Sequence, residues 1–333
     1  MPRAWRLTGS GDVDVLALEE FEVPALGPLD VQVGVHAAGL NRADILQRRG
    51  IYPAPAGAPA DIPGLEYAGR VEAVGARVTH RKPGDRVMGL VGGGAYAEQL
   101  VVNERETIAI PAGLSDTDAA ATTEAFLTAY RALFIEGGLN AGDWCLIRAA
   151  TSGIGIAAMQ LSRYFGCRSI GTGRNRERLE AVAGYGLDAL AVDGEDTLSG
   201  LVAEHAGDGV AVVLDLIGGS GAVKENLASL RPEGVQVLVG LMAGPKDQIN
   251  LAPVLFRRLT LRAMTMRSLP LERRIELAQL FERRLSAAFS NGALRPVVDT
   301  TLPFEQAREA QQLMESGRHT GKIVLRMDGP GTH

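Results

Sequence analysis

The sequence predicts an α/β protein that combines a doubly wound parallel sheet with a second, β-rich unit. Three observations lead to this prediction. Residues 145–161 read as a buried strand, a tight Gly-containing turn and an apolar helix. Beyond them, strand-like and helix-like segments alternate, as in doubly wound parallel sheets. The first third of the chain is rich in Gly and Pro between short runs of alternating polarity, which favours β-structure.

Length and composition indicate two domains and exclude several classes of protein. At 333 residues the chain exceeds the roughly 250–300 residues at which a single core stops growing. A net charge of −5 without a basic cluster argues against a nucleic-acid partner. No apolar run approaches the roughly 20 residues that span a bilayer, and the N-terminus lacks the pattern of a signal peptide. We therefore expect a cytoplasmic protein with no membrane role.

The β-rich unit is expected to occupy the first 123 residues. Period-two alternation and turn residues indicate strands around 31–35, 69–75 and 97–102, with a turn and strand at 83–87. From about Ser115 an acidic, Ala-rich stretch predicts a capped helix, and residues 125–135 predict a second helix. The β-rich texture ends there.

The rest of the chain carries the parallel sheet and then returns to the first unit. Strands are expected at 144–149, 169–172, 210–217 and 235–241, and helices at 156–165, 176–183 and 224–230. One long amphipathic helix is expected from Ile275 to Ala288, followed by a helix at 304–314 and a strand at 322–325. Because that last strand can return to the β-rich unit, we expect one domain of 1–123 plus 268–333 and another of 124–267.

The turn at 150–155 indicates a dinucleotide site. A helix N-terminus presents unpaired N–H groups and a partial positive charge, and small residues let a pyrophosphate approach the backbone. Ser152, Gly153 and Ile154 are the expected contacts. Ala150 and Ser152 replace the first two glycines of the strict G-x-G-x-x-G fingerprint, so these residues alone also fit an ordinary β-to-α turn.

The end of the next strand predicts the choice of cofactor. An NAD enzyme places Asp or Glu about 20 residues past the turn, to bond the ribose 2′-hydroxyl. Here Gly173 is followed by Arg174, with Arg176 and Arg178 close by, and a guanidinium suits a 2′-phosphate. The expected cofactor is therefore NADPH. The alternative is that these arginines form the solvated first turn of a helix.

The sequence offers no recognisable metal site. Cys145 falls in a predicted strand and Cys167 at a helix end, and both are expected to be small core residues. The five histidines are scattered and form no H-x-x-x-H pair. We expect no bound metal.

Seven motifs together resemble one family. They lie at 40–50, 63–69, 123–130, 151–155, 215–219, 240–242 and 321–325. The chain resembles the zinc-independent quinone oxidoreductase (zeta-crystallin-like) branch of the medium-chain dehydrogenase/reductase superfamily, and within it the stress-inducible NADPH quinone oxidoreductases. The resemblance implies a GroES-like catalytic domain joined to a Rossmann domain. It differs in detail at Arg174, where the family often has a Ser and a Lys.

The resemblance also implies the reaction. Zinc-dependent relatives carry Cys and His ligands around the positions of Asp44 and Leu65, and a four-cysteine lobe that this sequence lacks. Without such ligands no Lewis acid is available to polarise an alcohol. The implied reaction is direct hydride transfer to an acceptor that is already electrophilic, a small quinone or an enone. The proton would come from water or from Tyr52.

The resemblance implies site residues in both domains. Asn41, Asp44 and Ile45 would line the cofactor and substrate cleft, with Asn41 bonding a ribose hydroxyl or the substrate carbonyl, unless it simply braces its loop. Tyr52 would donate to a developing oxyanion, unless it is a packed loop residue. Catalytic roles therefore fall to Asn41 and Tyr52. Lys322 would face the cofactor or form a surface ion pair.

The remaining implied contacts lie on the nicotinamide side. Thr128 and Tyr130 would touch the nicotinamide or its ribose, although Tyr130 also fits a core aromatic. The other implied contacts follow apolar strands and are Ile217, Gly240, Leu241, Met242, Met266 and Arg267, the last two at the end of a strand expected at 260–266.

These residues favour NADPH-dependent reduction of quinones, with some activity on α,β-unsaturated carbonyls. Two alternatives stay open, an enoyl-thioester reductase and a crystallin-like protein that binds NADPH with little turnover. The resemblance implies a homodimer, and the alternating strand at 260–266 suits edge-to-edge pairing with its copy. A tetramer is not excluded.

Overall fold

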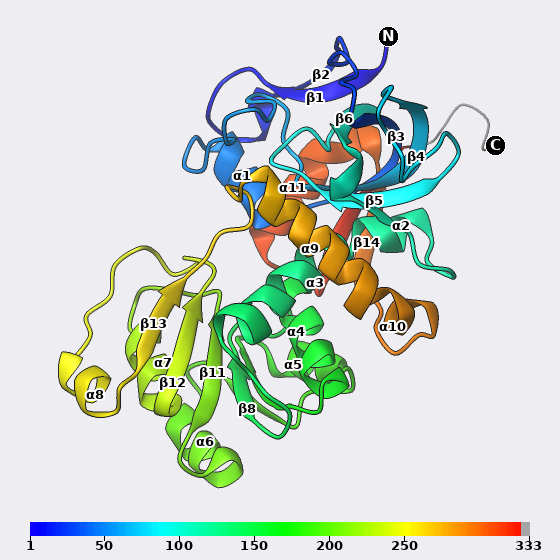
Figure 1. The fold of residues 1–333 in the computed structure, drawn as a ribbon. Coiled ribbons are helices and arrows are strands. Elements are labelled where there is room, and N and C mark those ends of the chain that lie inside the picture. Colours follow the sequence, from blue (N-terminus) through cyan, green and yellow to red (C-terminus); the bar gives the residue numbers. More distant parts are fainter. Residues whose placement is uncertain (328–333) are drawn as a thin grey trace. The chain divides into compact units, whose positions relative to one another are not determined.

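The computed structural model describes residues 1–327, and the chain divides into two compact units. The first unit contains residues 1–124 together with the chain from 266 onward, and the second contains residues 125–265 (Figure 1). The chain passes from the first unit to the second within helix α3 (Thr123–Tyr130). Both units mix helices with strands, which confirms the predicted α/β class.

The first unit is built on a seven-stranded, mostly antiparallel sheet in the order β14-β15-β3-β4-β5-β7, with β6 also paired to β3. A separate hairpin pairs β1 with β2. The strands are β1 (Arg3–Leu7), β2 (Leu16–Glu20), β3 (Asp30–Gly39), β4 (Glu66–Val74), β5 (Arg86–Leu90), β6 (Gln99–Asn103), β7 (Thr107–Ala109), β14 (Val298–Pro303) and β15 (Lys322–Arg326). The helices are α1 (Arg42–Arg48), α2 (Asp116–Ala120), α9 (Leu271–Arg284), α10 (Ser286–Ser290) and α11 (Ala307–Ser316), with short 3₁₀ turns at η1 (Val13–Val15), η2 (Glu104–Glu106) and η4 (Phe304–Gln306).

The C-terminal segment completes the sheet of the first unit. β15 pairs antiparallel with β3, which lies near the N-terminus, and parallel with β14. Helix α11 buries Ala307, Ala310 and Met314, whose spacing places them on one face, against the apolar core beneath the sheet. The indole N–H of Trp5 donates to the carbonyl of Phe304 at 2.7 Å, so the first strand is also tied to this segment.

The second unit is a six-stranded parallel sheet in the order β10-β9-β8-β11-β12-β13. The strands are β8 (Trp144–Ile147), β9 (Arg168–Gly173), β10 (Ala189–Val192), β11 (Val210–Asp215), β12 (Leu230–Leu238) and β13 (Thr260–Ala263). Its helices are α4 (Gly153–Tyr164), α5 (Arg176–Ala183), α6 (Leu198–Ala206), α7 (Ala222–Ser229) and α8 (Leu251–Phe256), and a π-helix, η3 (Arg131–Glu136), continues α3.

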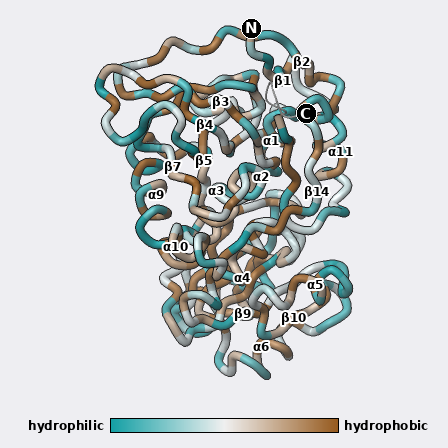
Figure 2. The backbone as a smooth tube through the Cα atoms, turned by 90° about the vertical axis from the view of Figure 1, so that its right-hand side faces the viewer, coloured by the Kyte–Doolittle hydropathy of each residue, from teal (hydrophilic) through white to brown (hydrophobic). Residues whose placement is uncertain are grey.

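The strand order of the second unit reverses direction between β8 and β11. From β8 the chain moves outward through β9 to β10, and it then returns to the other side of β8. Right-handed crossovers place helices on both faces of such a sheet and open a crevice at the carboxyl ends of the two central strands. Helix α4 is largely buried, and in Figure 2 the tube is brown, that is hydrophobic, over much of it. Helix α9 of the first unit is by contrast largely teal, that is hydrophilic.

Two predicted elements are wrong in extent. The strand expected at 260–266 ends at Ala263, because β12, its partner among the described residues, ends at Leu238 opposite it. The single helix expected from Ile275 to Ala288 is two helices, because the backbone at Leu285 turns to φ −119° and interrupts the helical path.

Within residues 1–327, no helix combines the length and the apolar character that a membrane crossing requires.

Candidate functional site

The turn between β8 and α4 has the form of an anion cradle. Ala149 adopts a positive φ of 56°, and a Cβ on Gly155 would lie 2.6 Å from the carbonyl oxygens of Ala149 and Ala150, so only glycine fits there. The Ser152 hydroxyl accepts from the N–H of Gly155 at 3.0 Å and caps the helix. The N–H groups of Gly153 and Ile154, at the partly exposed first turn of α4, have no acceptor within the helix. They are the donors that a pyrophosphate would take.

Strand β9 is the neighbour of β8 in the sheet, and a cationic residue, Arg174, follows its end. Gly173 is the last residue of β9, and a Cβ there would lie 3.2 Å from the side chain of Leu179. Arg174 is exposed and takes part in no ion pair among the described residues. Arg176 instead pairs with Asp196 at 3.0 Å and Glu195 at 3.5 Å.

Arg178 is placed differently from Arg174. Its backbone N–H donates to the Asn175 side chain, which caps α5. Arg178 is also only partly exposed, whereas Arg174 is exposed and takes part in no ion pair that the structure describes within residues 1–327.

The loops after β11 and β12 form the next part of the carboxyl edge. Ile217 N–H and Gly218 N–H both donate to one oxygen of the Asp215 carboxylate, at 2.8 and 3.1 Å. Burial raises the pKa of Asp215, and these two N–H donors act in the opposite direction. On the neighbouring loop Leu241 and Met242 are each 52% exposed, and a Cβ on Gly240 would lie 2.7 Å from the carbonyl of Leu216.

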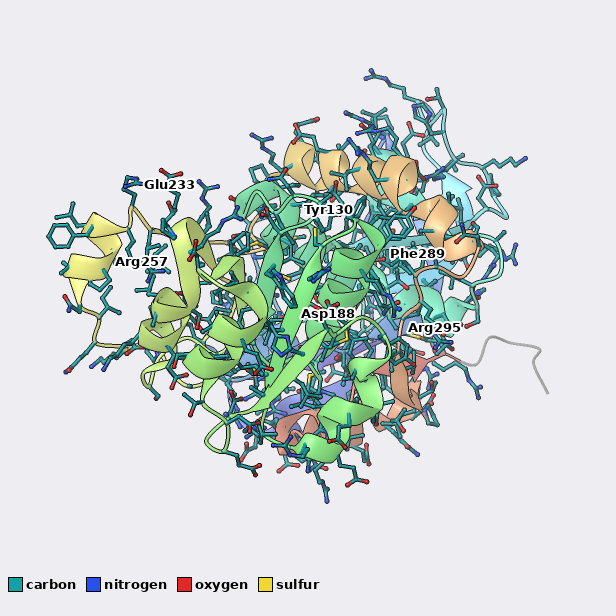
Figure 3. All side chains as sticks on the ribbon, turned by 90° about the horizontal axis from the view of Figure 1, so that it is seen from below. Tyr130, Asp188, Glu233, Arg257, Phe289 and Arg295 are labelled. Carbon is teal, nitrogen blue, oxygen red and sulfur yellow. The ribbon has the colours of Figure 1, made fainter. Side chains whose placement is uncertain are left out.

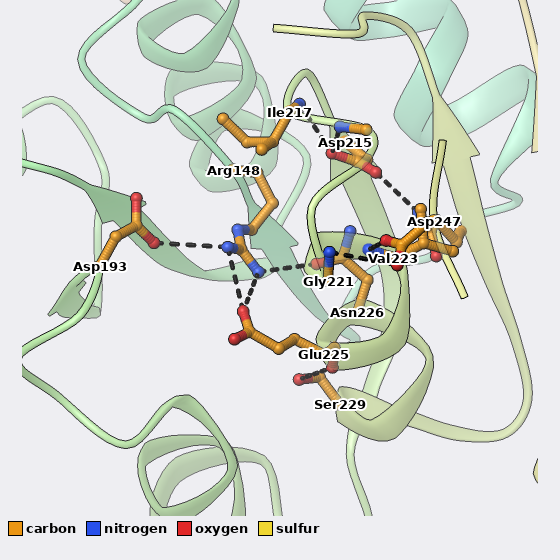
Figure 4. A network of polar contacts seen from close by, with 12 residues as sticks. Arg148, Asp193, Asp215, Ile217, Gly221, Val223, Glu225, Asn226, Ser229 and Asp247 are labelled. Carbon is orange, nitrogen blue, oxygen red and sulfur yellow. Dashed lines mark hydrogen bonds and ion pairs between the residues drawn. The ribbon is translucent and has the colours of Figure 1, made fainter. Parts of the chain in front are cut away.

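Arg148 belongs to this edge although the sequence analysis did not select it. It follows β8 directly, and its buried guanidinium donates to Asn226 at 2.9 Å and lies 3.3 Å from Glu225, both on α7 (Figure 4). It also lies 3.4 Å from Asp193, which follows β10. One side chain therefore links the loops of three strands. The only signal in the sequence is a charged residue at the end of an otherwise apolar strand.

Helix α3 supplies the two remaining predicted residues of this unit, Thr128 and Tyr130. Thr128 is 1% exposed. The ring of Tyr130, labelled in Figure 3, packs 5.1 Å from Phe134 and 5.7 Å from Phe165, centroid to centroid. This placement matches the alternative reading of Tyr130 as a core aromatic.

In the first unit, the predicted residues Asn41 and Lys322 meet in a buried polar cluster. Lys322 Nζ lies 2.6 Å from the Glu66 carboxylate and donates to Asn41 Oδ1 at 2.7 Å and to the Leu40 carbonyl at 2.6 Å. Asn41 Nδ2 donates to Glu66 at 3.1 Å. Lys322 thus forms a buried ion pair rather than a surface one, and both polar atoms of the Asn41 side chain have partners within this unit.

Asp44 is the titratable group next to that cluster. Its carboxylate accepts from the backbone N–H of Asn41 at 2.8 Å, from the Tyr96 hydroxyl at 3.0 Å and from the N–H of Gly64 at 3.3 Å. Complete burial raises the pKa of Asp44 to about 6 despite these donors and the positive charges of Lys322 and Arg267. No local sequence pattern indicates the role of Glu66 or Tyr96, because that role depends on partners far away in the chain.

Arg267 braces loops of the first unit. Its guanidinium donates to the carbonyls of Gly92 at 2.7 Å and Tyr52 at 2.6 Å, and to Gln47 Oε1 at 2.6 Å. It lies 5.4 Å from the centroid of the Tyr52 ring. Burial lowers the pKa of Arg267, because loss of water disfavours the charged guanidinium, and the nearby Asp44 carboxylate acts in the opposite direction. Tyr52 itself is partly exposed.

Two further predicted residues are fully or almost fully buried. Ile45 is 0% exposed and belongs to the apolar core of the first unit, and Met266 is 5% exposed. Cys145 and Cys167 are free and buried. Over residues 1–327, no group of three or more His, Cys, Asp or Glu side chains is placed to hold a metal ion.

The fold and the carboxyl edge of the second unit define a dinucleotide-binding protein of the Rossmann kind. The glycine-dependent turn, the free first-turn amides of α4 and the strand reversal at β8 and β11 are its parts. The first unit adds a sheet of a different, antiparallel kind.

Family models agree with both units. Residues 27–112 match the alcohol dehydrogenase GroES-like domain, and residues 186–325 match the zinc-binding dehydrogenase model. The chain belongs to the medium-chain dehydrogenase/reductase superfamily of oxidoreductases, among proteins like quinone oxidoreductase. This confirms the resemblance drawn from the sequence motifs and the predicted GroES-like and Rossmann fold.

Three relatives illustrate the family. The quinone oxidoreductase of Lama guanicoe is 30% identical, with 97% of each chain covered. The human synaptic vesicle membrane protein VAT-1 homolog is 32% identical over 97% of this chain and 86% of the relative. The polyketide synthase component PikAII of Streptomyces venezuelae is 34% identical over 98% of this chain, which corresponds to 9% of that protein.

Solved structures show the same fold. A quinone oxidoreductase of Pseudomonas syringae pv. tomato DC3000 has a TM-score of 0.88 and 29% identity, covering 98% of this chain and all of the other. A mycobacterial protein solved in complex with NADPH has a TM-score of 0.87 and 27% identity, with the same coverage. A protein described as an NAD-dependent alcohol dehydrogenase has a TM-score of 0.86 and 28% identity, again with the same coverage.

Proposed function

We propose that this oxidoreductase uses NADPH to reduce quinones, and α,β-unsaturated carbonyls more slowly, by direct hydride transfer without a metal. The single observation that carries the choice of NADPH is Arg174, an exposed arginine outside any ion pair of residues 1–327, at the end of β9 where an NAD enzyme would place an acid. A phosphate accepts paired N–H donors from a guanidinium.

The second unit would hold the dinucleotide through groups already in position. Gly153 and Ile154 would donate their N–H groups to the pyrophosphate, with the turn shaped by Ser152. Arg174 would hold the 2′-phosphate, and the loop at Gly240, Leu241 and Met242 would receive the carboxamide of the nicotinamide. The bound nicotinamide supplies the hydride.

Side chains of the first unit would interact with the acceptor. Tyr52 is the proposed hydroxyl donor to the carbonyl that gains negative charge, and its loop is held by Arg267. Asn41 acts through position, because its amide bonds Glu66 and Lys322 rather than presenting free atoms. A quinone or enone suits this arrangement because either is already electrophilic.

We also propose a homodimer. β13 is the last strand of its sheet, and Leu261 on it is 47% exposed. Just before β13 in the chain, α8 exposes Leu255 and Phe256 by 72% and 76%, and in Figure 3 the side chains of this yellow helix extend outward near Arg257. An unpaired edge flanked by apolar side chains suits pairing with a second copy.

Two measurements test the proposed function. Calorimetric titration should show NADPH binding at least about tenfold more tightly than NADH, the effect of one charge-assisted contact. Loss of NADPH absorbance is then followed with benzoquinone, an enone and an enoyl thioester. Turnover fastest with the quinone supports the proposal, and equal affinities for the two cofactors contradict the role of Arg174.

The acceptor series also tests the second candidate function. A polyketide synthase component is among the relatives, at 34% identity, and this favours an enoyl-thioester reductase as the alternative. Turnover fastest with the thioester would replace the quinone in the proposal. Tight NADPH binding with no acceptor reduced would favour a binding protein instead.

A further inference from the structure

The loop that follows β12 has no apolar anchor of its own. Each side chain from 241 to 248 is exposed or only partly buried. Burial of apolar area, which fixes most loops near a core, therefore contributes little here. Its conformation must depend on polar contacts with a neighbouring segment.

That neighbouring segment is the loop between β11 and α7. Backbone N–H groups of Met242 and Ala243 donate to the carbonyls of Leu216 and Ile217, at 3.3 and 2.8 Å. In the opposite direction Gly219 and Ser220 donate to carbonyls of the β12 loop, at 3.0 and 3.2 Å. The two loops thus continue the contact between their strands beyond the end of the sheet.

The close approach of these loops requires glycine. A Cβ on Gly219 would lie 2.4 Å from the Lys246 carbonyl oxygen, and Gly218 has a φ of 74°. Glycine permits this close approach, but because its backbone dihedral angles are the least restricted of any residue, it also allows the loop to adopt other conformations. A further contact is needed to make the conformation a single one.

Asp247 provides that contact. One of its carboxylate oxygens accepts from the N–H of Gly221 at 3.1 Å, and the other accepts from the N–H of Val223 at 2.9 Å, in the first turn of α7 (Figure 4). The Ser220 hydroxyl adds a bond to the Ala243 carbonyl at 2.9 Å. Asp215 holds the start of the same β11 loop through Ile217 and Gly218, so two aspartates fix its two ends.

We propose that Asp247 is a positioning residue for the nicotinamide end of the cofactor. By capping α7 it fixes the β12 loop, and with it the backbone of Gly240, Leu241 and Met242. This inference rests on the proposed function, in which that backbone receives the carboxamide. In this proposal Asp247 acts through the loop and not by contact with the cofactor, and the 2′-phosphate end would lie at Arg174, which follows a different strand, β9.

The test compares two ligands in calorimetric titrations. NADPH reaches both ends of the site, whereas 2′-phospho-ADP-ribose lacks the nicotinamide. We expect Asp247→Ala to weaken NADPH binding roughly tenfold and to leave 2′-phospho-ADP-ribose within about twofold of wild type. Asp247→Asn keeps one acceptor oxygen and should fall between, and it remains informative if the alanine variant does not fold.

The matched control is Asn250→Ala. Asn250 caps α8 through one bond to the N–H of Ala252 at 3.0 Å, in the same connection between β12 and β13. It should leave both affinities unchanged. Hydrogen exchange without ligand should be faster at the backbone amides of residues 241–244 and 246–248 in the Asp247 variants only.

Three results would overturn the proposal. Unchanged NADPH affinity in Asp247→Ala removes the positioning role while the proposed function stands. Equal weakening of both ligands shows a general loosening of the edge. Failure of the wild-type protein to bind NADPH at all refutes the proposed function, and this inference with it. That outcome is distinguished from the other two because it is seen in the wild-type protein, without any variant.

Discussion

Arg174 differs from the nearby arginines in what surrounds its charge. Arg176, two positions on, is already engaged by two carboxylates, and Arg178 is only partly exposed, whereas Arg174 is exposed. A guanidinium outside any ion pair keeps its N–H donors available for a phosphate. The residues on either side of it, Gly173 and Asn175, are uncharged, so neither repels that phosphate.

The first prediction concerns this side chain. Arg174→Gln should weaken NADPH binding about ten- to a hundredfold, the effect of losing a charge-assisted bond, and leave NADH binding unchanged. Calorimetric titration with both cofactors measures it. Arg168→Gln is the control, because Arg168 lies at the other end of β9, against the ring of Trp144. Equal losses for NADPH and NADH would contradict the assignment.

The second prediction concerns Asp44. Burial raises its pKa from 3.8 to about 6, so the folded state binds a proton that the unfolded state releases between these values. Its contribution to stability is full below about pH 4 and is lost as the pH rises through 6, by up to about 3 kcal/mol. Asp44→Asn should remove this dependence. Urea unfolding from pH 4.5 to 7.5 measures it, and parallel profiles for the two proteins would refute it.

The residues of the site differ in how far a local pattern could predict them. The positions of Ser152 and Arg174 were predictable from local pattern, because Ser152 caps the helix that follows β8 and Arg174 directly follows β9. Arg148, Glu66 and Asp247 were not, because each acts through a partner far along the chain. No spacing rule connects Lys322 with Glu66, which only the fold brings to 2.6 Å.

At the scale of elements, β15 is fastened to the sheet by charge as well as by its ladder. Lys322, at its first position, pairs with Glu66 at the start of β4, and both side chains are almost fully buried. Removing one partner of a buried pair leaves an isolated charge without water, which costs more than the pair itself is worth.

The third prediction follows from this pair. Lys322→Met should lower the free energy of unfolding by about 3–5 kcal/mol, and adding Glu66→Gln should restore much of it, since no charge is then left buried. Arg258→Met, which breaks an ion pair exposed by more than 60% on both sides, should change it by at most about 1 kcal/mol. Urea denaturation gives all four values. A double variant no more stable than Lys322→Met would argue against buried charge as the cause.

Elements were predictable where hydrophobic periodicity is strong and less so at their ends. The buried strand β11 and helix α4 occur where the pattern predicts them, whereas β13 stops early because its partner strand stops. The break at Leu285 leaves no mark in the pattern, because the apolar spacing continues through it into α10.

For the whole molecule, the fourth prediction concerns assembly. Leu261→Lys places a charge on the free edge of β13 and should convert the proposed dimer to a monomer without unfolding it. Light scattering coupled to gel filtration measures the mass. Leu271→Lys, at an exposed leucine of the first unit, should leave the dimer intact. A monomeric wild-type protein would exclude the dimer.

The return of β15 to β3 has a consequence for synthesis on the ribosome. The chain from 125 to 265 contains every strand of its own sheet, so it can fold as soon as it emerges. The sheet that contains β3 must wait, with that edge unpaired, until β15 has been translated. The first unit to be started is therefore the last to be finished, and during that interval its open edge is the part of the nascent chain that most needs a chaperone.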